Sequence, residues 1–251
     1  MTKITHILFD CDNTLVLSEE LAFEACADLA NIILASQGIT DKYTGPQLMG
    51  EFIGQNFRGM MNGLQKKYNF QLGDQTFNKY VTQEEDMVIA KLEAKAQPCV
   101  NCMPVLQEVH DSGKYGMAVV SSSAHRRVLA SVTKVDQLKY FPADVIFSAA
   151  TSLPKPTSKP DPAVYIHAMK AVGKQPSECV AVEDSKSGTG AAVNAGILTI
   201  GYVGPYEKEG REKQDEMAKL LTEVGAKVIM YDWKEFWECL EKIEQMPASR
   251  L

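Results

Sequence analysis

The sequence predicts an α/β protein in which a doubly wound parallel sheet is interrupted after its first strand by an all-helical domain. Two observations predict this class. Short apolar runs typical of buried strands alternate along the chain with segments whose apolar residues recur at helical spacing. Residues 16–97, which follow the first apolar run, show helical spacing only. We therefore expect a sheet domain of residues 1–15 and 98–251, and a helical domain of residues 16–97.

The individual elements follow from the same patterns. The predicted strands are residues 4–9, 116–120, 145–147, 179–182, 198–201 and 227–230. The predicted helices of the sheet domain are residues 105–110, 124–134, 161–172, 186–195, 212–224 and 233–244. The helical domain is expected to contain helices at 19–37, 46–67 and 74–95, the first ending at Gly38.

The composition excludes several classes of protein. Hydrophobic residues make up 45% of the chain and charged residues 23%, which is typical of a soluble globular protein. The net charge of −6 argues against a nucleic-acid-binding protein, which would need a basic face. We find neither a secretory signal nor an apolar run of membrane-spanning length. We therefore expect a cytoplasmic monomer or weak dimer without nucleic-acid or membrane partners.

The six cysteines are expected to be free thiols, as in most cytosolic proteins. Cys99 and Cys102 have the spacing of a redox pair or of half a metal site. No second pair at metal spacing accompanies them, and prolines flank them on both sides. We expect the two residues to lie in a hinge at 96–103, with the other hinge at 15–18.

Two carboxylates follow the first predicted strand. Asp10 and Asp12 lie just beyond it, where ligands bind in open parallel sheets. Carboxylates at such a position need partners, and a divalent cation is a natural one because hard cations prefer oxygen ligands. The alternative is a turn or helix-capping role for one of the two aspartates.

Three further polar groups occupy comparable positions. Ser121–Ser123 follow the second strand, where they can bind a phosphate or simply cap a helix. Glu183 and Asp184 follow a later strand, where acids also suit a helix start. Lys159 precedes a helix and can offset negative charge, although most lysines are solvated surface residues.

Together these elements resemble the four motifs of the haloacid dehalogenase (HAD) superfamily. Asp10-x-Asp12-x-Thr14 is similar to its first motif, Ser121 to its second, Lys159 to its third and Glu183-Asp184 to its fourth. The resemblance covers essentially the whole chain and is greatest to the β-phosphoglucomutase-like branch of sugar-phosphate phosphatases. It implies a Rossmann-like core with the helical domain inserted as a cap that closes over the site.

The resemblance implies a phosphatase that acts on a small phosphomonoester, a sugar or polyol phosphate, through an aspartyl-phosphate. Asp10 is expected to be the nucleophile and Asp12 the general acid and base. The implied cofactor is Mg²⁺, held by Asp10, the backbone carbonyl of Asp12, and Asp184. Glu183 is expected to bind the metal directly or through water.

The resemblance also implies phosphate and substrate contacts. Lys159 and Ser121 are expected to hold the phosphoryl oxygens, helped by backbone N–H groups near Cys11 and Ser122. Arg58 follows Gly54 in the segment where this branch carries a specificity loop, and is a candidate substrate contact. An exposed structural arginine is the alternative.

The choice of lysine and the residue after Asp12 are two details of the motifs in this sequence. In the family the lysine precedes Pro-x-Pro and a helix with an aromatic residue, so Lys159 with Tyr165 fits and Lys155 does not. Asn13 stands where the family commonly has glycine. Asparagine tolerates a left-handed backbone, so we expect the turn to survive.

Four alternative functions agree less well with the sequence. A dehalogenase would lack Asp12. A mutase of the β-phosphoglucomutase type would carry a cap histidine that residues 19–24 lack. A phosphonatase would need a buried cap lysine, and nothing marks one among Lys42, Lys66 and Lys67. A non-catalytic binding protein that retains the fold is the alternative outside enzymes, because fold does not determine function.

Overall fold

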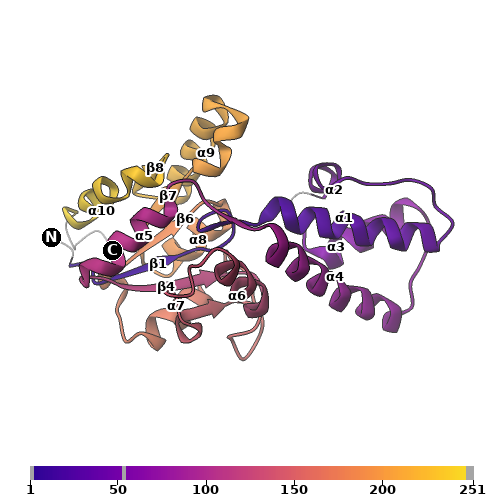
Figure 1. Ribbon diagram of the computed structural model, residues 1–251, viewed down its shortest axis with the longest axis horizontal. Helices are drawn as coiled ribbons and strands as arrows, with labels where there is room; N and C mark the ends of the chain where they lie inside the picture. The colour runs from indigo at the N-terminus through magenta and orange to yellow at the C-terminus, as the bar shows by residue number, and fades with distance from the viewer. Residues whose placement is uncertain (1–2, 53–54, 247–251) are drawn as a thin grey trace. The chain divides into compact units, whose positions relative to one another are not determined.

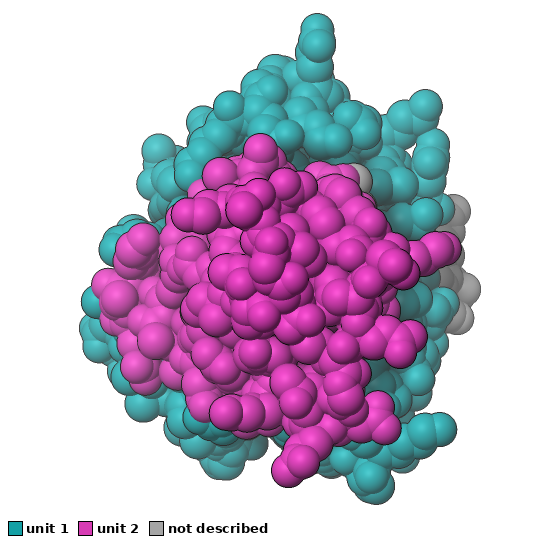
Figure 2. All heavy atoms as spheres, turned by 90° about the vertical axis from the view of Figure 1, so that its right-hand side faces the viewer, with its two compact units in different colours: residues 1–17, 97–251 teal, residues 18–96 magenta. Residues whose placement is uncertain are grey.

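The computed structural model describes residues 3–52 and 55–246, and the chain divides into two compact units (Figure 1). Unit 1 comprises Met1–Leu17 and Gln97–Leu251, and unit 2 comprises Ser18–Ala96. Figure 2 shows the two units in different colours.

Unit 1 is built on a six-stranded sheet of order β5-β4-β1-β6-β7-β8 whose paired strands are all parallel. The strands are β1 (His6–Phe9), β4 (Gly116–Ser121), β5 (Ile146–Ser148), β6 (Cys179–Glu183), β7 (Leu198–Tyr202) and β8 (Val228–Met230). The chain adds β4 and β5 on one side of β1 and then β6 to β8 on the other. The predicted fold class is confirmed, and β1 lies where the strand order reverses.

The helices of unit 1 cover both faces of this sheet (Figure 1). They are α5 (Cys102–Ser112), α6 (His125–Lys134), α7 (Ala163–Ala171), α8 (Lys186–Asn194), α9 (Arg211–Val224) and α10 (Phe236–Glu244). Short 3₁₀ helices occur at Ala143–Val145, Pro176–Glu178, Gly204–Glu209 and Trp233–Glu235. Because side chains alternate along a strand, neighbouring residues of β1 pack into different layers. Leu8 packs with residues of α7 and α8, whereas the ring of Phe9 lies against Phe141, Trp233 and Phe236.

In the described residues of unit 2, four helices form a bundle: α1 (Glu19–Ser36), α2 (Gly45–Glu51), α3 (Phe57–Lys67) and α4 (Asp74–Lys95). Its core contains Leu29, Ile33, Leu48 and Leu64, all fully buried. Gly38 adopts φ +74 just beyond α1, as a helix-terminating glycine does. Within the described residues, no helix is both long and apolar enough to cross a membrane.

The predicted helix at 46–67 is in fact two helices, α2 and α3. The N–H of Gly59 donates to the side-chain oxygen of Asn56, which caps the start of α3. Apolar spacing continues through both helices because both pack on the same core, so periodicity alone does not reveal the break. Gly54, which the sequence places in the specificity loop, lies outside the described residues.

The prediction that residues 16–97 are entirely helical is wrong at both ends. Strands β2 (Val16–Leu17) and β3 (Gln97–Pro98) form a two-stranded antiparallel sheet in which Val16 pairs with Pro98. Each strand has only two residues, so neither has a periodicity of its own. The pairing joins segments far apart in the sequence, and local patterns do not report it.

Candidate active site

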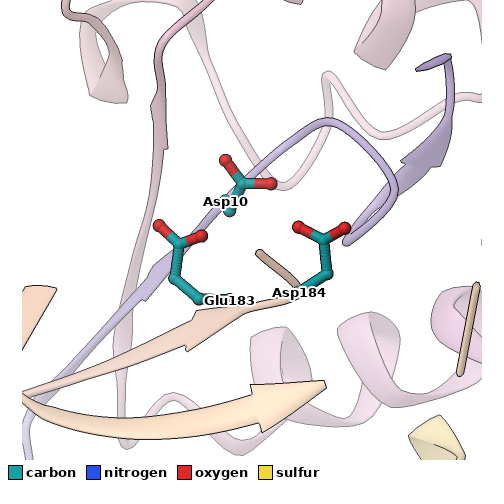
Figure 3. A group of neighbouring side chains, drawn as sticks. All are labelled: Asp10, Glu183 and Asp184. Atoms are coloured by element: carbon teal, nitrogen blue, oxygen red, sulfur yellow. The ribbon is translucent and has the colours of Figure 1, made fainter. Parts of the chain in front are cut away.

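The candidate site lies at the carboxyl ends of β1, β4 and β6, which are adjacent in the sheet. Asp10 follows β1, Ser121 ends β4, and Glu183 ends β6 with Asp184 directly after it. Figure 3 shows the carboxylates of Asp10, Glu183 and Asp184 turned toward a common space. The topology thus brings together three of the four motifs at the crevice where parallel sheets bind ligands.

A tight turn follows Asp10. The carbonyl of Cys11 accepts the N–H of Val16 at 3.1 Å, and Asn13 adopts a left-handed φ of 58. The buried Trp233 ring donates from Nε1 to the carbonyl of Thr14 at 3.2 Å. The expectation that the turn survives with asparagine in place of glycine is confirmed. Cys11 itself is fully buried.

Lys159 supplies the buried positive charge of the site. Its ammonium donates to Asp10 Oδ1 at 2.6 Å, to Glu183 Oε1 at 2.6 Å and to the carbonyl of Val120 at 2.7 Å. An ammonium has three protons, and these three acceptors use them all. Lys155, the neighbouring lysine that the sequence argument set aside, is exposed.

The electrostatics of the site are dominated by burial. Burial raises the pKa of Asp10, against the opposing effect of Lys159. Burial likewise raises the pKa of Glu183 to about 7, again against Lys159. Burial alone would lower the pKa of Lys159, but Asp10 and Glu183 hold it above its ordinary value. The lysine is therefore charged at neutral pH, whereas burial works against ionisation of both carboxyl groups.

The acidic cluster fits a divalent cation. Asp10, Glu183 and Asp184 are buried, and each offers a ligand oxygen within 4.8 Å of the other two. Glu183 Oε2 is buried and has no hydrogen-bond partner within the part of the chain that the structure describes. The three carboxylates, when ionised, exceed the charge of one ammonium, and a dication would balance the excess. Carboxylate oxygens are the ligands that hard cations prefer.

Two residues that the sequence argument did not assign to the site fix the position of Glu183. The buried Tyr165 hydroxyl donates to Glu183 Oε1 at 2.5 Å, and Lys159 Nζ lies 5.3 Å from the centroid of the Tyr165 ring. Gly188, in the first turn of α8, leaves the space that Glu183 Oε2 occupies. In the sequence, the aromatic residue in the helix after Lys159 was a signal for the contact of Tyr165 with Glu183. No local pattern marks the space that Gly188 leaves for Glu183.

Gly188→Ala is expected to lower the free energy of unfolding by about 1–3 kcal/mol, because the added methyl group would overlap the Glu183 carboxylate. Gly190→Ala in the same helix is the matched control. Its methyl group would lie 3.4 Å from Pro160 Cβ, an ordinary contact, and alanine is the better helix former. Urea denaturation of both variants measures the difference. Equal stability of the two variants would contradict this role of Gly188.

Asp12 is held by serines at the end of β4 and just beyond it. Ser121 Oγ and Ser123 Oγ both donate to Asp12 Oδ2, at 3.2 and 2.8 Å. The Ser122 hydroxyl accepts the backbone N–H of Lys159 at 3.2 Å. The structure therefore brings Asp12, Ser121 and Ser122 together with Lys159, and adds Ser123, which stood in the serine run without an assigned role.

Arg58 belongs to unit 2 and is exposed. Its guanidinium donates to Asn78 Oδ1 at 2.9 Å and lies 5.6 Å from the centroid of the Phe77 ring. It lines a largely polar cavity of about 860 Å³ with Asn62, Lys66 and other residues of that unit. Its role as a substrate contact stays a prediction.

All six cysteines are free and buried, as expected for thiols. Cys99 Sγ donates a hydrogen bond to the carbonyl of Asn13 at 3.3 Å, so Cys99 contributes to stabilising the turn after Asp10. Burial raises the pKa of both Cys99 and Cys102. Thiols in this state are poor nucleophiles, which gives Cys99 a packing role.

The chain matches, over residues 4–196, the family described as haloacid dehalogenase-like hydrolase. It is 28% identical to the 6-phosphogluconate phosphatase of Escherichia coli (strain K12), over 78% of this chain and 81% of that one. It is also 28% identical to a phosphorylated carbohydrates phosphatase of Thermotoga maritima, over 88% of this chain and 91% of that one. A HAD hydrolase of family IA, variant 3, from Entamoeba histolytica has the same fold, with a TM-score of 0.75 and 20% identity over 96% of this chain and 100% of that one. The resemblance drawn from the motifs is confirmed.

Proposed function

Because the chain belongs to the haloacid dehalogenase-like hydrolase family, we propose that it is a magnesium-dependent phosphatase of a small phosphorylated sugar or polyol. The observation that carries this proposal is the buried group of Asp10, Glu183 and Asp184 around the Lys159 ammonium. Such a group suits a reaction in which a carboxylate must approach a phosphate dianion. Relatives named for phosphatases of 6-phosphogluconate and of phosphorylated carbohydrates support the substrate class.

In the first proposed step, an Asp10 carboxylate oxygen attacks the phosphorus in line with the ester bond. The bond from phosphorus to the substrate oxygen breaks, and an aspartyl-phosphate forms. Asp12 donates a proton to the departing alkoxide, which leaves as the alcohol. Ser121 and Lys159 hold the phosphoryl oxygens, helped by the backbone N–H groups near Cys11 and Ser122.

In the second step, Asp12 takes a proton from water as the water oxygen attacks phosphorus. The bond between phosphorus and Asp10 breaks, releasing inorganic phosphate and the free carboxylate. Asp10, the carbonyl of Asp12, Asp184 and Glu183, directly or through water, would hold Mg²⁺. When bound, Mg²⁺ supplies charge stabilisation to the phosphoryl oxygens.

The test is a screen of the purified protein against sugar phosphates, polyol phosphates, 6-phosphogluconate and 4-nitrophenyl phosphate, with release of phosphate as the readout. EDTA is expected to lower the rate by roughly 10²-fold or more, and added Mg²⁺ to restore it. Asp184→Asn should raise the Mg²⁺ concentration that gives half-maximal activity. Asp161→Asn, at an exposed position, is the control for loss of a carboxylate.

Three outcomes of this screen would contradict the proposed function. Hydrolysis that is unaffected by EDTA would exclude a magnesium-dependent mechanism. Transfer of the phosphoryl group to a sugar hydroxyl, with no release of phosphate, would indicate a mutase instead. Absence of turnover with every ester, with Mg²⁺ present, would favour a binding protein.

A further inference from the structure

One oxygen of the Asp12 carboxylate accepts hydrogen bonds from two serine hydroxyls. Ser123 Oγ donates to Asp12 Oδ2 at 2.8 Å, and Ser121 Oγ donates to the same oxygen at 3.2 Å. The shorter distance indicates that the bond from Ser123 is the better formed of the two. Ser123 was not assigned to the site from the sequence, and the proposed mechanism does not use it.

The two serines cannot play the same part during the reaction. A serine hydroxyl has one proton to donate. In the proposed function the Ser121 hydroxyl donates to a phosphoryl oxygen, so its bond to Asp12 must break when substrate binds. The Ser123 hydroxyl then remains as the serine donor that keeps Asp12 Oδ2 in place.

The backbone holds Ser123 firmly. Its N–H donates to Ser121 Oγ at 3.0 Å, and its carbonyl accepts the hydroxyl of Ser148 at 2.7 Å. Ser148 is fully buried at the end of β5, where it pairs in the sheet with Ser121. The backbone of Ser123 is therefore tied to residues of two adjacent strands, as a rigid support for another side chain requires.

We infer that Ser123 is a positioning residue for Asp12: its hydroxyl orients the carboxyl group that exchanges the proton with the leaving group. This inference rests on the proposed function. Its effect should depend on the leaving group, because an alkoxide needs a proton to depart whereas 4-nitrophenolate does not.

The test compares Ser123→Ala and Ser123→Thr with the wild-type enzyme on an alkyl phosphate and on 4-nitrophenyl phosphate. For Ser123→Ala, kcat/KM with the alkyl ester is expected to fall roughly 10–100-fold, part of what a general acid contributes. With 4-nitrophenyl phosphate the fall should be less than about threefold, and KM should change little. Ser123→Thr, which keeps the hydroxyl, should recover most of the loss.

A double-mutant cycle separates positioning from a general structural effect. In an Asp12→Asn background, Ser123→Ala should cost no further activity with the alkyl ester, because the group it orients no longer transfers a proton. Equal losses of kcat/KM with both esters, or additive losses in the cycle, would overturn the inference, because kcat/KM reports on the first step, in which the leaving group departs. A raised KM with unchanged kcat would also overturn it, by making Ser123 a substrate contact.

The inference can fail separately from the proposed function. If the wild-type protein hydrolyses no phosphomonoester with Mg²⁺, the proposed function fails before any variant is made. A crystal structure of Ser123→Ala with inorganic phosphate bound, which engages the Ser121 hydroxyl and so removes its bond to Asp12, then still reports on Asp12. We expect the Asp12 side chain to leave the conformer in which Oδ2 faces residues 121 and 123, and an unchanged conformer would refute the positioning role.

Discussion

Asp10→Asn is expected to lower the rate of phosphate release by at least about 10⁴-fold, the order of loss that follows removal of a catalytic nucleophile. An amide oxygen does not form the aspartyl-phosphate, although asparagine has nearly the same shape as aspartate. The variant should still fold, because the oxygen of the asparagine side chain can accept the hydrogen bond from Lys159. Initial rates with saturating Mg²⁺, on protein checked by circular dichroism, measure the loss.

Asp161→Asn is the matched control for this variant. Asp161 lies two residues after Lys159 and is exposed, and its carboxylate caps the N–H of Ala163. Asparagine can accept that same bond, so activity should stay near the wild-type value. A folded Asp10→Asn protein with wild-type rates would show that Asp10 is not the nucleophile.

Lys159→Met should have the largest effect on stability, a loss of about 3–5 kcal/mol in the free energy of unfolding. Methionine fills similar space but leaves Asp10 and Glu183 buried without their ammonium partner. Activity should fall as well, since the phosphoryl group loses a positive contact. Urea denaturation of the metal-free protein at neutral pH gives the free energy.

The same variant has a predicted pH dependence. Without Lys159 the buried carboxyl groups take up protons on folding, because burial raises the pKa of Glu183 above its ordinary value of 4.5. Such a group disfavours the folded state increasingly as pH rises. The deficit relative to wild type should therefore be larger at pH 8 than at pH 5.

Lys155→Met is the control for loss of a lysine. Lys155 is exposed, four residues before Lys159, and its replacement should change stability by no more than about 0.5 kcal/mol. Similar stability losses in the two variants would contradict the view that Lys159 compensates the buried carboxylates.

The features that were predicted from the sequence are those with a local cause. The apolar runs that end at Phe9 and Val182 mark buried strands, and the carboxyl ends of parallel strands meet at one edge. Asp10 and Asp184 could therefore be expected near each other before any coordinates were known. The left-handed Asn13 is local too, since it depends on one residue type.

The features that were missed depend on contacts between distant segments. The bond from Ser123 to Asp12 joins the loops after β4 and β1, and no local pattern says which of three serines will reach the carboxylate. The space beside Gly188 is meaningful only once Glu183 is known to point into it. The break between α2 and α3 was missed because both helices pack on one core.

The two-residue pairing of β2 with β3 has a consequence for the thermodynamics of the whole chain. It brings the residues at either end of the segment 18–96 side by side. A flexible loop of that length would cost about 4 kcal/mol of closure entropy. Because unit 2 folds with its own core, its ends are brought together by its own packing. For the folding of unit 1, the inserted segment therefore behaves like a short hairpin loop, because its two ends are already close together. This explains how a long helical segment can interrupt a sheet directly after the strand that precedes Asp10.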